Sequence, residues 1–325
     1  MLDGSYVEKQ PMITVGMPTR NNGSTIGLAL NSLSEQKYSK MKIRVVIVDG
    51  LSTDNTHRKI TAWVKENRNR FSSIQVLVKR SNIPKARNIC LENSRGRYVL
   101  FWDADVVAPP NGISSLLNHF KDPKVGIVNH PYYVENPGVI EKVFGSEISD
   151  SVSDVKAVVM GFTMIRKQLF EKFGYFDERL EGFEDQEFCR RIVKRGIRVL
   201  MDPSVRLKHL KRGTSLRTYA KENFSRRSKY VNALIRTGSR INIFRAMYYI
   251  LMPLNFIAGA LVAEFLCLKF GICMLEVATI YMLPSIVWHL RRAKRSYYGL
   301  LSPVVHLIGG ITLAYGMLWQ AAKEK

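Results

Sequence analysis

Two acidic pairs in the sequence have the residue types and spacing for chemistry on a charged substrate. In the first, Asp103 and Asp105 flank Ala104 directly after the apolar run at residues 98–102. Carboxylates at i and i+2 leave the chain on one side where it turns, so they suit a hard divalent cation that keeps positions open for phosphate oxygens. An Asx turn that closes the strand would use the same residues structurally. Both interpretations stay open for these residues alone.

The second acidic pair, Glu184 and Asp185, stands at the start of a predicted helix whose apolar face includes Phe188 and Ile192. The helix dipole favours acidic residues at this end, which explains much of the cluster without any function. In the functional interpretation, one carboxylate is a general base that takes a proton from a bound acceptor.

Arg87 and His209 are the other candidates for chemistry. Arg87 lies near the start of a helix predicted over residues 84–93, where backbone donors and cationic side chains could meet an anion. His209 lies in a strand-like run at residues 204–210. A lone histidine is more often structural, and the alternative is a metal ligand or an acceptor contact.

Alternating strand and helix patterns must position these residues. Strands are predicted at residues 13–17, 43–48, 74–78, 98–102 and 125–128, with helices over residues 24–36, 53–65 and 84–93 between the first four. This order predicts an α/β fold with a mainly parallel sheet and helices on both faces. Ligands bind beyond the carboxyl ends of such strands, where Thr19, Arg20 and Asp49 also gather. The chain contains no GxGxxG or GxxxxGK[ST] motif.

The charge of the chain is concentrated in one stretch. The 325 residues carry a net charge of +22, with 46% hydrophobic residues, which excludes a disordered or collagen-like protein. Residues 206–240 hold eleven Lys and Arg against one Glu. Such a stretch suits nucleic acid or an anionic membrane. Its aromatic residues do not form a stacking platform, so we expect anionic lipids and not nucleic acid as the partner.

Three apolar runs follow the basic stretch, at residues 246–268, 271–290 and 300–320. Each is about 20 residues long, which is enough to cross a hydrocarbon core. The basic residues before the first run and at 291–295 predict a multi-pass cell-membrane protein with a cytoplasmic N-terminal domain. We therefore expect an α/β domain at residues 1–210, a basic amphipathic juxtamembrane segment at 211–243, and an all-α membrane region at 244–325 with two to three transmembrane helices.

Five motifs, in order, resemble the family 2, inverting, GT-A-fold glycosyltransferases. They read MPTRN at residues 17–21, VDGLSTDNT at 48–56, ARN at 86–88, FWDADV at 101–106 and FEDQEFCRRI at 183–192. Each motif is weak alone, whereas five in order at predicted strand ends are specific for the family. The second motif has Asp-Gly-Leu where many members have Asp-Asp-Gly, and the QxxRW motif of processive members is absent.

The resemblance implies a role for each matching residue. Asp49 is similar to the carboxylate that reads the nucleotide base, and Arg87 to a base or diphosphate contact. Asp105 resembles the direct metal ligand, and Asp185 the general base, with Glu184 beside it. The implied nucleotide-sugar site is Pro18, Thr19, Arg20, Asp49, Arg87, Asp103 and Ala104. The implied metal site is Asp105, Asp103 and His209, holding Mg²⁺ or Mn²⁺.

The resemblance and the basic stretch together predict a membrane-bound, metal-dependent hexosyltransferase. We expect a nucleotide-sugar donor and, as acceptor, a hydroxyl of a lipid-linked, polyprenyl-type saccharide. A polyprenyl-phosphate acceptor is the alternative, and it needs little help from a base because phosphate is already anionic. A nucleotidyltransferase and a non-catalytic membrane scaffold fit the sequence less well, since the first needs a Gly-rich loop after the first strand and the second has no use for both acidic pairs.

Overall fold

The computed structural model describes residues 10–144, 151–180, 182–211, 213–225 and 287. The chain divides into two compact units, Met1–Glu135 with Ile148–Lys211, and Asn136–Glu147 with Arg212–Lys325. The first unit contains all the strands that the described residues form and all the residues that sequence reasoning assigned to the site.

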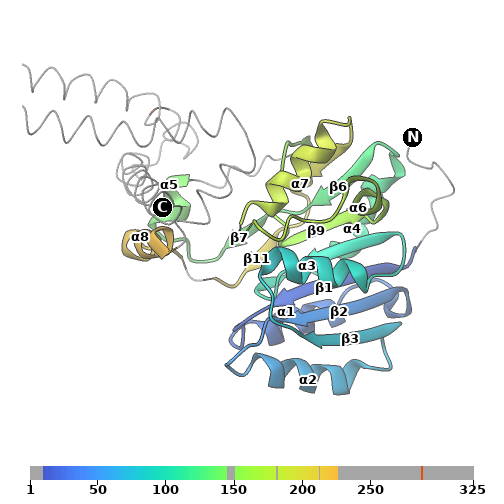
Figure 1. Ribbon diagram of the computed structural model, residues 1–325, viewed down its shortest axis with the longest axis horizontal. Coiled ribbons are helices and arrows are strands. Elements are labelled where there is room, and N and C mark those ends of the chain that lie inside the picture. Colours follow the sequence, from blue (N-terminus) through green and yellow to red (C-terminus); the bar gives the residue numbers. More distant parts are fainter. Residues whose placement is uncertain (1–9, 145–150, 181, 212, 226–286, 288–325) are drawn as a thin grey trace, which may run out of the picture. The chain divides into compact units, whose positions relative to one another are not determined.

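Eight strands of the first unit form one sheet in the order β3-β2-β1-β4-β9-β6-β10-β8 (Figure 1). Their bounds are β1 Ile13–Thr19, β2 Ile43–Asp49, β3 Ser73–Val78, β4 Tyr98–Trp102, β6 Val125–Asn129, β8 Ser153–Asp154, β9 Phe162–Arg166 and β10 Arg198–Met201. Strands β3, β2, β1 and β4 are mutually parallel, β9 runs antiparallel between β4 and β6, and the short β8 is antiparallel to β10. The predicted α/β fold with a mainly parallel sheet is confirmed.

Helices cover both faces of this sheet, because the central strands are apolar on both sides. The apolar core on one face includes residues of α1 (Ile26–Ser34), α2 (Thr56–Asn67) and α4 (Gly112–Asn118). The core on the other face includes residues of α3 (Ile83–Glu92), α6 (Gln168–Phe173) and α7 (Glu184–Val193). Two short 3₁₀ helices, Lys40–Lys42 and His119–Lys121, complete the helical elements of this unit.

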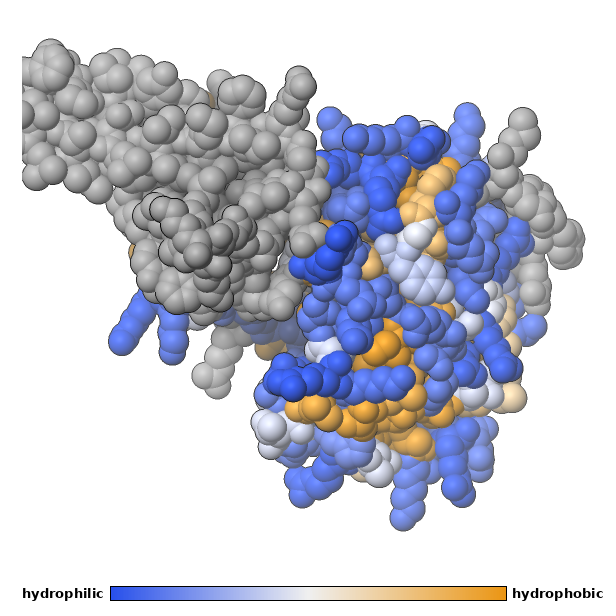
Figure 2. Space-filling view, in the orientation of Figure 1, coloured by the Kyte–Doolittle hydropathy of each residue, from blue (hydrophilic) through white to orange (hydrophobic). Residues whose placement is uncertain are grey.

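Strand β3 forms the edge of the sheet beside β2. Its residues are half-buried up to Leu77, and Val78 is exposed. Figure 2 shows hydrophobic side chains reaching the surface over β2 and β3. The partial burial of residues 74–78 is therefore that of an edge strand, whereas the complete burial of β1 is that of a central strand.

Helix α2 begins later than its sequence pattern suggests. The prediction started it at residue 53 or 54, whereas the helix begins at Thr56. The Asp54 carboxylate accepts hydrogen bonds from the backbone N–H of Thr56 at 2.9 Å and of Gly23 at 2.9 Å. Asp54 therefore closes a turn and joins the β2–α2 loop to the β1–α1 loop, which moves the start of the helix.

A second, three-stranded sheet was not foreseen apart from its middle strand. Its order is β5-β11-β7, with bounds Val106–Val107, Leu207–His209 and Tyr132–Val134. Strand β11 is antiparallel to β5 and parallel to β7. Its members come from distant parts of the chain, so local sequence patterns could not predict the pairing.

The described part of the second unit contains α5 (Val139–Phe144) and α8 (Leu216–Ser225). The Glu141 carboxylate accepts hydrogen bonds from the backbone N–H groups of Gly138 at 2.9 Å and Thr214 at 2.8 Å. These bonds tie the start of α5 to the residues that precede α8.

Apart from residue 287, the three apolar runs predicted to cross the membrane lie outside the described residues, as does most of the basic segment at residues 211–243. Among the residues that the structure describes, no helix combines the length and the apolar character needed to span a bilayer. The membrane region therefore stays a prediction from the sequence.

Candidate active site

The segment Asp103-Ala104-Asp105 forms a tight turn between β4 and β5. The Asp103 N–H donates to the Gly161 carbonyl at 2.8 Å, and the Val106 N–H donates to the Asp103 carbonyl at 3.1 Å. Indole Nε1–H of Trp102 donates to the Val106 carbonyl at 2.8 Å. Ala104 is buried, while both aspartates reach solvent. The turn is therefore held by its backbone and by Trp102, which leaves the two carboxylates available.

The small sheet brings His209 to Asp105. Residue 209 on β11 pairs with Val106 on β5, and the Leu210 N–H donates to the Asp105 carbonyl at 2.8 Å. As a result, His209 Nε2 lies 3.3 Å from Asp105 Oδ2. Imidazole Nδ1 of His209 is buried and has no hydrogen-bond partner among the described residues. The structure thus joins two of the three residues predicted to hold a metal.

The second acidic pair occupies the first turn of α7, as predicted. Phe188 and Ile192 anchor the helix in the core. Phe183, which precedes the helix, has the left-handed backbone angle φ = 65°, an uncommon conformation for a bulky residue that is frequent at functional sites. Glu184 points into the protein and is buried, whereas Asp185 is half-buried. One helix turn therefore presents two carboxylates in different environments.

Arg87 joins the two acidic pairs. It lies on α3, whose N-cap Asn82 accepts a hydrogen bond from the Lys85 N–H at 3.0 Å. The buried Arg87 guanidinium donates through Nη1 to the Glu184 carboxylate, and its Nη2 lies 3.5 Å from Asp103 Oδ1. Its Nε is buried without a hydrogen-bond partner in the described structure. Sequence reasoning placed Arg87 against a ligand anion, whereas here its contacts are protein carboxylates.

The carboxyl groups around Arg87 have raised pKa values. Burial raises the pKa of Asp103 to about 6, with the Arg87 charge opposing the shift and the Asp105 charge adding to it. Burial also raises the pKa values of Glu184 and Asp185, and Arg87 again opposes both shifts. One guanidinium is therefore shared by several carboxylates, so the site has an excess of negative charge. Perturbed carboxyls of this kind are typical of functional sites.

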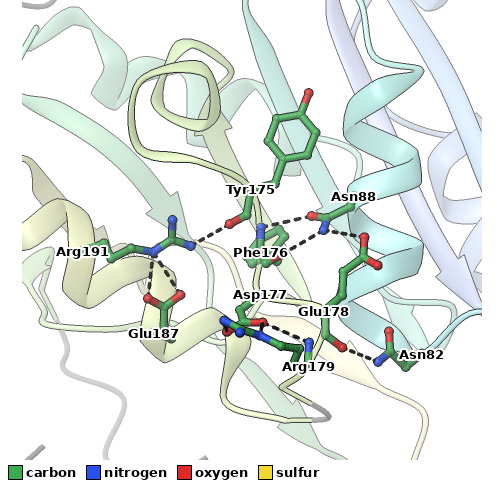
Figure 3. A network of polar contacts seen from close by, with 9 residues as sticks. All are labelled: Asn82, Asn88, Tyr175, Phe176, Asp177, Glu178, Arg179, Glu187 and Arg191. Carbon is green, nitrogen blue, oxygen red and sulfur yellow. Dashed lines mark hydrogen bonds and ion pairs between the residues drawn. The ribbon is translucent and has the colours of Figure 1, made fainter. Parts of the chain in front are cut away.

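A strap formed by residues 174–180 links α3 to α7 (Figure 3). On the α3 side, the Asn88 amide donates to the Phe176 carbonyl at 2.9 Å and to Glu178 Oε1 at 3.0 Å, while its carbonyl accepts the Phe176 N–H at 3.1 Å. The Asn82 amide donates to the Glu178 carbonyl at 2.7 Å. The buried side chain of Asn88 therefore directs all its polar atoms to the strap.

On the α7 side, Arg191 holds the other end of the same strap. Its guanidinium donates to the carbonyls of Phe173, of Gly174 at 3.3 Å and of Tyr175 at 2.7 Å, and Glu187 anchors it through an ion pair at 2.8 Å. Figure 3 shows this continuous network from Asn82 to Arg191. Arg87 lies on α3, whereas Glu184 and Asp185 lie on α7. Because the strap joins these two helices, it sets the distance from Arg87 to the two carboxylates.

The first prediction concerns this strap. Asn88→Asp replaces the amide donor that faces the Phe176 carbonyl and the Glu178 carboxylate with a second negative charge. We expect a loss of about 2–3 kcal/mol in the free energy of unfolding, measured by urea denaturation, since the buried Phe176 carbonyl loses its donor and the exposed Glu178 carboxylate faces a like charge. Adding Glu178→Gln restores a donor and should recover part of the loss. A double variant no more stable than the single one would contradict this account.

The residues predicted to bind the nucleotide lie at the ends of β1 and β2. Pro18 and Thr19 are buried, Arg20 is exposed, and the Gly50 N–H donates to the Thr19 carbonyl at 2.8 Å. All lie at the carboxyl end of the sheet, which also carries Asp103, because β1, β2 and β4 are parallel. Within the described residues, no side-chain hydrogen bond or ion pair links this group to the Arg87 cluster, and the two groups share only the carboxyl end of the sheet.

Asp49 has local partners that sequence reasoning missed. Its Oδ1 accepts hydrogen bonds from the Ser52 N–H at 2.9 Å and from the Ser52 hydroxyl at 2.6 Å. Its Oδ2 lies 3.5 Å from Nδ1 of the half-exposed His57. Asp49 therefore closes the turn after β2 with one oxygen and faces His57 with the other. An aspartate followed three residues later by serine was the available signal for this turn.

The donor chemistry of the site fits a divalent cation. Carboxylate and imidazole donors such as Asp105 and His209 suit first-row divalent metals, and the negative excess around Arg87 favours a cation. Asp103 faces Arg87, and in the described part of the chain no three His, Cys, Asp or Glu side chains form a ready-made chelating group. The residues present therefore supply a two-residue metal site, which other ligands would complete.

The same fold occurs among solved structures. The fold resembles that of the mannosyltransferase PcManGT from Pyrobaculum calidifontis, solved in complex with GDP-Man and Mn²⁺, at a TM-score of 0.66 and 19% identity, over 98% of this chain and 90% of that one. At this identity the likeness establishes the fold.

Two curated relatives align with parts of the chain. TarS of Staphylococcus aureus, a poly(ribitol-phosphate) beta-N-acetylglucosaminyltransferase, is 37% identical over 28% of this chain and 16% of its own length. WfaP of Escherichia coli, a UDP-Glc:alpha-D-GlcNAc-diphosphoundecaprenol beta-1,3-glucosyltransferase, is 28% identical over 42% of this chain and 51% of its own. The alignments thus cover about half of WfaP and a sixth of TarS.

The family model described as glycosyl transferase family 2 matches residues 14–195, which is more than half of the chain and includes both acidic pairs. The match agrees with the sheet order, with the resemblance of the five motifs and with the geometry around Arg87. The chain belongs to glycosyl transferase family 2.

Proposed function

We propose that this chain is a membrane-bound, inverting glycosyltransferase that moves a sugar from a nucleotide-sugar donor to a hydroxyl of a lipid-linked saccharide. The observation that carries the proposal is the pair of carboxylates at the start of α7. Arg87 engages Glu184, whereas Asp185 is half-buried beside the same charge cluster. A site for a saccharide hydroxyl needs a base of this kind.

Asp185 is the proposed general base. Burial raises the pKa of Asp185, so its deprotonated carboxylate is a stronger base than that of an ordinary aspartate. The acceptor oxygen forms a bond to the anomeric carbon, the bond from that carbon to the diphosphate oxygen breaks, and the electron pair leaves with the diphosphate. Asp185 takes the hydroxyl proton. A single displacement of this kind inverts the configuration.

Glu184 and Arg87 have supporting roles in this proposal. Glu184, first considered as a catalytic partner of Asp185, is buried against the guanidinium and is better placed to hold Arg87. Arg87 opposes the rise that burial causes in the pKa values of Glu184 and Asp103. Its position on α3 then fixes both carboxylates relative to the carboxyl end of β4.

Asp105 and His209 would hold the divalent cation, with Asp103 beside them. When bound, such a cation neutralises charge that develops on a diphosphate leaving group. Solved structures of the same fold contain Mn²⁺, as in PcManGT and in GalNAc-T7 with UDP, GalNAc and Mn²⁺, which supports the cofactor and does not separate Mn²⁺ from Mg²⁺. Pro18, Thr19, Arg20, Asp49 and Ala104 remain the proposed contacts of the nucleotide sugar.

Sequence features outside the described residues and one relative support the lipid-linked acceptor. The apolar runs from residue 246 and the basic stretch before them would keep the site near lipid headgroups, with the catalytic domain in the cytoplasm and anionic lipids at the basic face. WfaP acts on a sugar linked to diphosphoundecaprenol. The alternative acceptor, a polyprenyl phosphate, needs little base help and so leaves the environment of Asp185 unexplained.

The full chain in detergent, with a panel of radiolabelled nucleotide sugars and Mn²⁺, tests this proposal. One arm receives a polyprenyl-diphosphate-linked monosaccharide and the other a polyprenyl phosphate, and label entering the organic phase is counted. We expect transfer in the first arm. Transfer only in the second arm would establish the alternative acceptor, and hydrolysis without transfer in either arm would overturn the lipid-linked acceptor.

A further inference from the structure

The imidazole of His209 lacks the hydrogen bond that usually orients a metal-binding histidine. In most metal sites the second ring nitrogen donates to a carboxylate or a carbonyl, and that bond fixes the plane of the ring. Here Nε2 faces Asp105 at 3.3 Å, while Nδ1 is buried without a partner among the described residues. Another contact must therefore fix the ring.

Tyr132 supplies that contact. Its ring stacks on the His209 imidazole, with centroids 4.6 Å apart and planes inclined by 26°. The stacking depends on the small sheet, because β7 and β11 are parallel and pair Tyr132 with Leu207, two residues before His209. Side chains two residues apart on a strand lie on the same face. The register therefore places the two rings on one face of the small sheet.

Gly161 provides the space for the tyrosine ring. A Cβ atom at this position would lie 3.1 Å from Tyr132 Cε1 and 3.4 Å from Asp103 Oδ2. The Gly161 carbonyl also accepts the Asp103 N–H at 2.8 Å. One backbone position thus contacts the Asp103 turn on one side and the tyrosine ring on the other. A methyl group there would require the ring that is stacked on His209 to shift by a few tenths of an ångström.

We propose that Tyr132 is a positioning residue, whose ring fixes the plane of the His209 imidazole by stacking on it and so keeps Nε2 directed at Asp105. Gly161 is required for this packing. The inference rests on the metal role that the proposed function gives to Asp105 and His209. It assigns a purpose to a residue in none of the five family-like motifs. The part of Tyr132 that acts is the flat ring, and its hydroxyl is not needed.

Three substitutions separate positioning from ordinary packing. Tyr132→Phe keeps the flat ring, Tyr132→Leu keeps the apolar volume without it, and Gly161→Ala places a methyl group about 3.1 Å from the ring and so shifts its stacking on His209. Binding of Mn²⁺ alone to the full chain is measured by electron paramagnetic resonance or calorimetry, with thermal unfolding as the check on folding. We expect Tyr132→Leu and Gly161→Ala to weaken Mn²⁺ binding about tenfold, the range found for residues that orient metal ligands, and Tyr132→Phe to stay within about twofold of the unsubstituted chain.

A His209→Ala background provides the decisive control. If Tyr132 acts through the imidazole, Tyr132→Leu should weaken Mn²⁺ binding no further once the imidazole is gone. An equal loss in both backgrounds, or unchanged binding in folded Tyr132→Leu and Gly161→Ala, would overturn the proposal. Transfer to the lipid-linked saccharide is assayed separately, so a chain that binds Mn²⁺ in a Tyr132-dependent manner but transfers no sugar would remove the proposed function and leave this inference standing.

Discussion

Asp185→Asn is expected to reduce the transfer rate by about 10³-fold or more while binding of the nucleotide sugar persists. The amide has nearly the shape of the carboxylate but cannot accept the hydroxyl proton, and general base catalysis contributes roughly 10²–10⁴-fold. Rates are measured with saturating donor and acceptor, and donor affinity by calorimetry. A variant with undiminished turnover would show that Asp185 is not the base.

Two neighbouring carboxylates on α7 serve as controls. Glu187 lies on the same helix outside the Arg87 cluster and is linked to it only through Arg191 and the strap, so Glu187→Gln should reduce activity far less than Asp185→Asn does. Glu184→Gln removes a charge that holds Arg87 and should have an intermediate effect. This ranking distinguishes loss of the base from loss of any acidic residue at the start of α7.

The pH dependence gives an independent test of the same assignment. A base must be deprotonated to act, so activity should rise with pH through the pKa of Asp185. Since burial raises that pKa, with Arg87 opposing, we expect the acidic limb of the profile above the range of an ordinary aspartate. If the profile stays flat down to the ordinary aspartate range, the buried environment of Asp185 has no catalytic consequence.

Local patterns were sufficient to predict much of the first unit. The runs that became β1, β2, β4 and β6 are mostly apolar, and polar residues end each of them, so the strand positions and their common carboxyl end could be predicted from the sequence. The turn at Asp103 and the start of α7 at Glu184 were predictable for the same reason. These features depend on residues close together in sequence.

Features that depend on distant pairing were not predictable from local patterns, although the family resemblance did imply that His209 and Asp105 share a metal site. His209 joins Asp105 because β11 pairs with β5 across about 100 residues, and Tyr132 enters from a third strand that has three residues only. The protein partner of Arg87 was not predicted either, because a cation at a helix start suggests a ligand anion, and the fold brings Glu184 to the same guanidinium from a helix 97 residues away. The contact of Arg87 with a nucleotide base or diphosphate stays a prediction. The fold, and not local propensity, sets these contacts.

Arg87→Met is expected to lower the free energy of unfolding of the full chain by about 3–5 kcal/mol at neutral pH. Removing one partner of a buried ion pair leaves the other charge uncompensated, which costs far more than the pair itself contributes. Here Glu184 and Asp103 would both lose the guanidinium that faces them. Methionine keeps most of the apolar length of the side chain, so the effect reports charge and not volume.

The sign of the pH dependence follows from the carboxyl groups. Burial already raises the pKa of Glu184 and brings that of Asp103 to about 6 against the opposing charge of Arg87, and loss of this charge raises both further. The folded variant then binds more protons than its unfolded chain between about pH 4 and the raised pKa values, so its stability falls as pH increases through this window. The difference from the unsubstituted chain should therefore be smaller at pH 5 than at pH 8.

A second substitution identifies the cause of this loss. Arg87→Met combined with Glu184→Gln removes both charges of the buried pair, and we expect the double variant to be more stable than Arg87→Met alone when urea unfolding is compared at pH 8. Asp103 lacks the facing guanidinium in both variants, so recovery should be incomplete. A single variant that loses less than about 1 kcal/mol, or a double variant that is no more stable, would mean that solvent and not Arg87 compensates Glu184. If the expected order is observed, Arg87 is the residue that allows several carboxylates to remain charged in one site, which is the condition for Asp185 to act as a base beside a metal-binding pair.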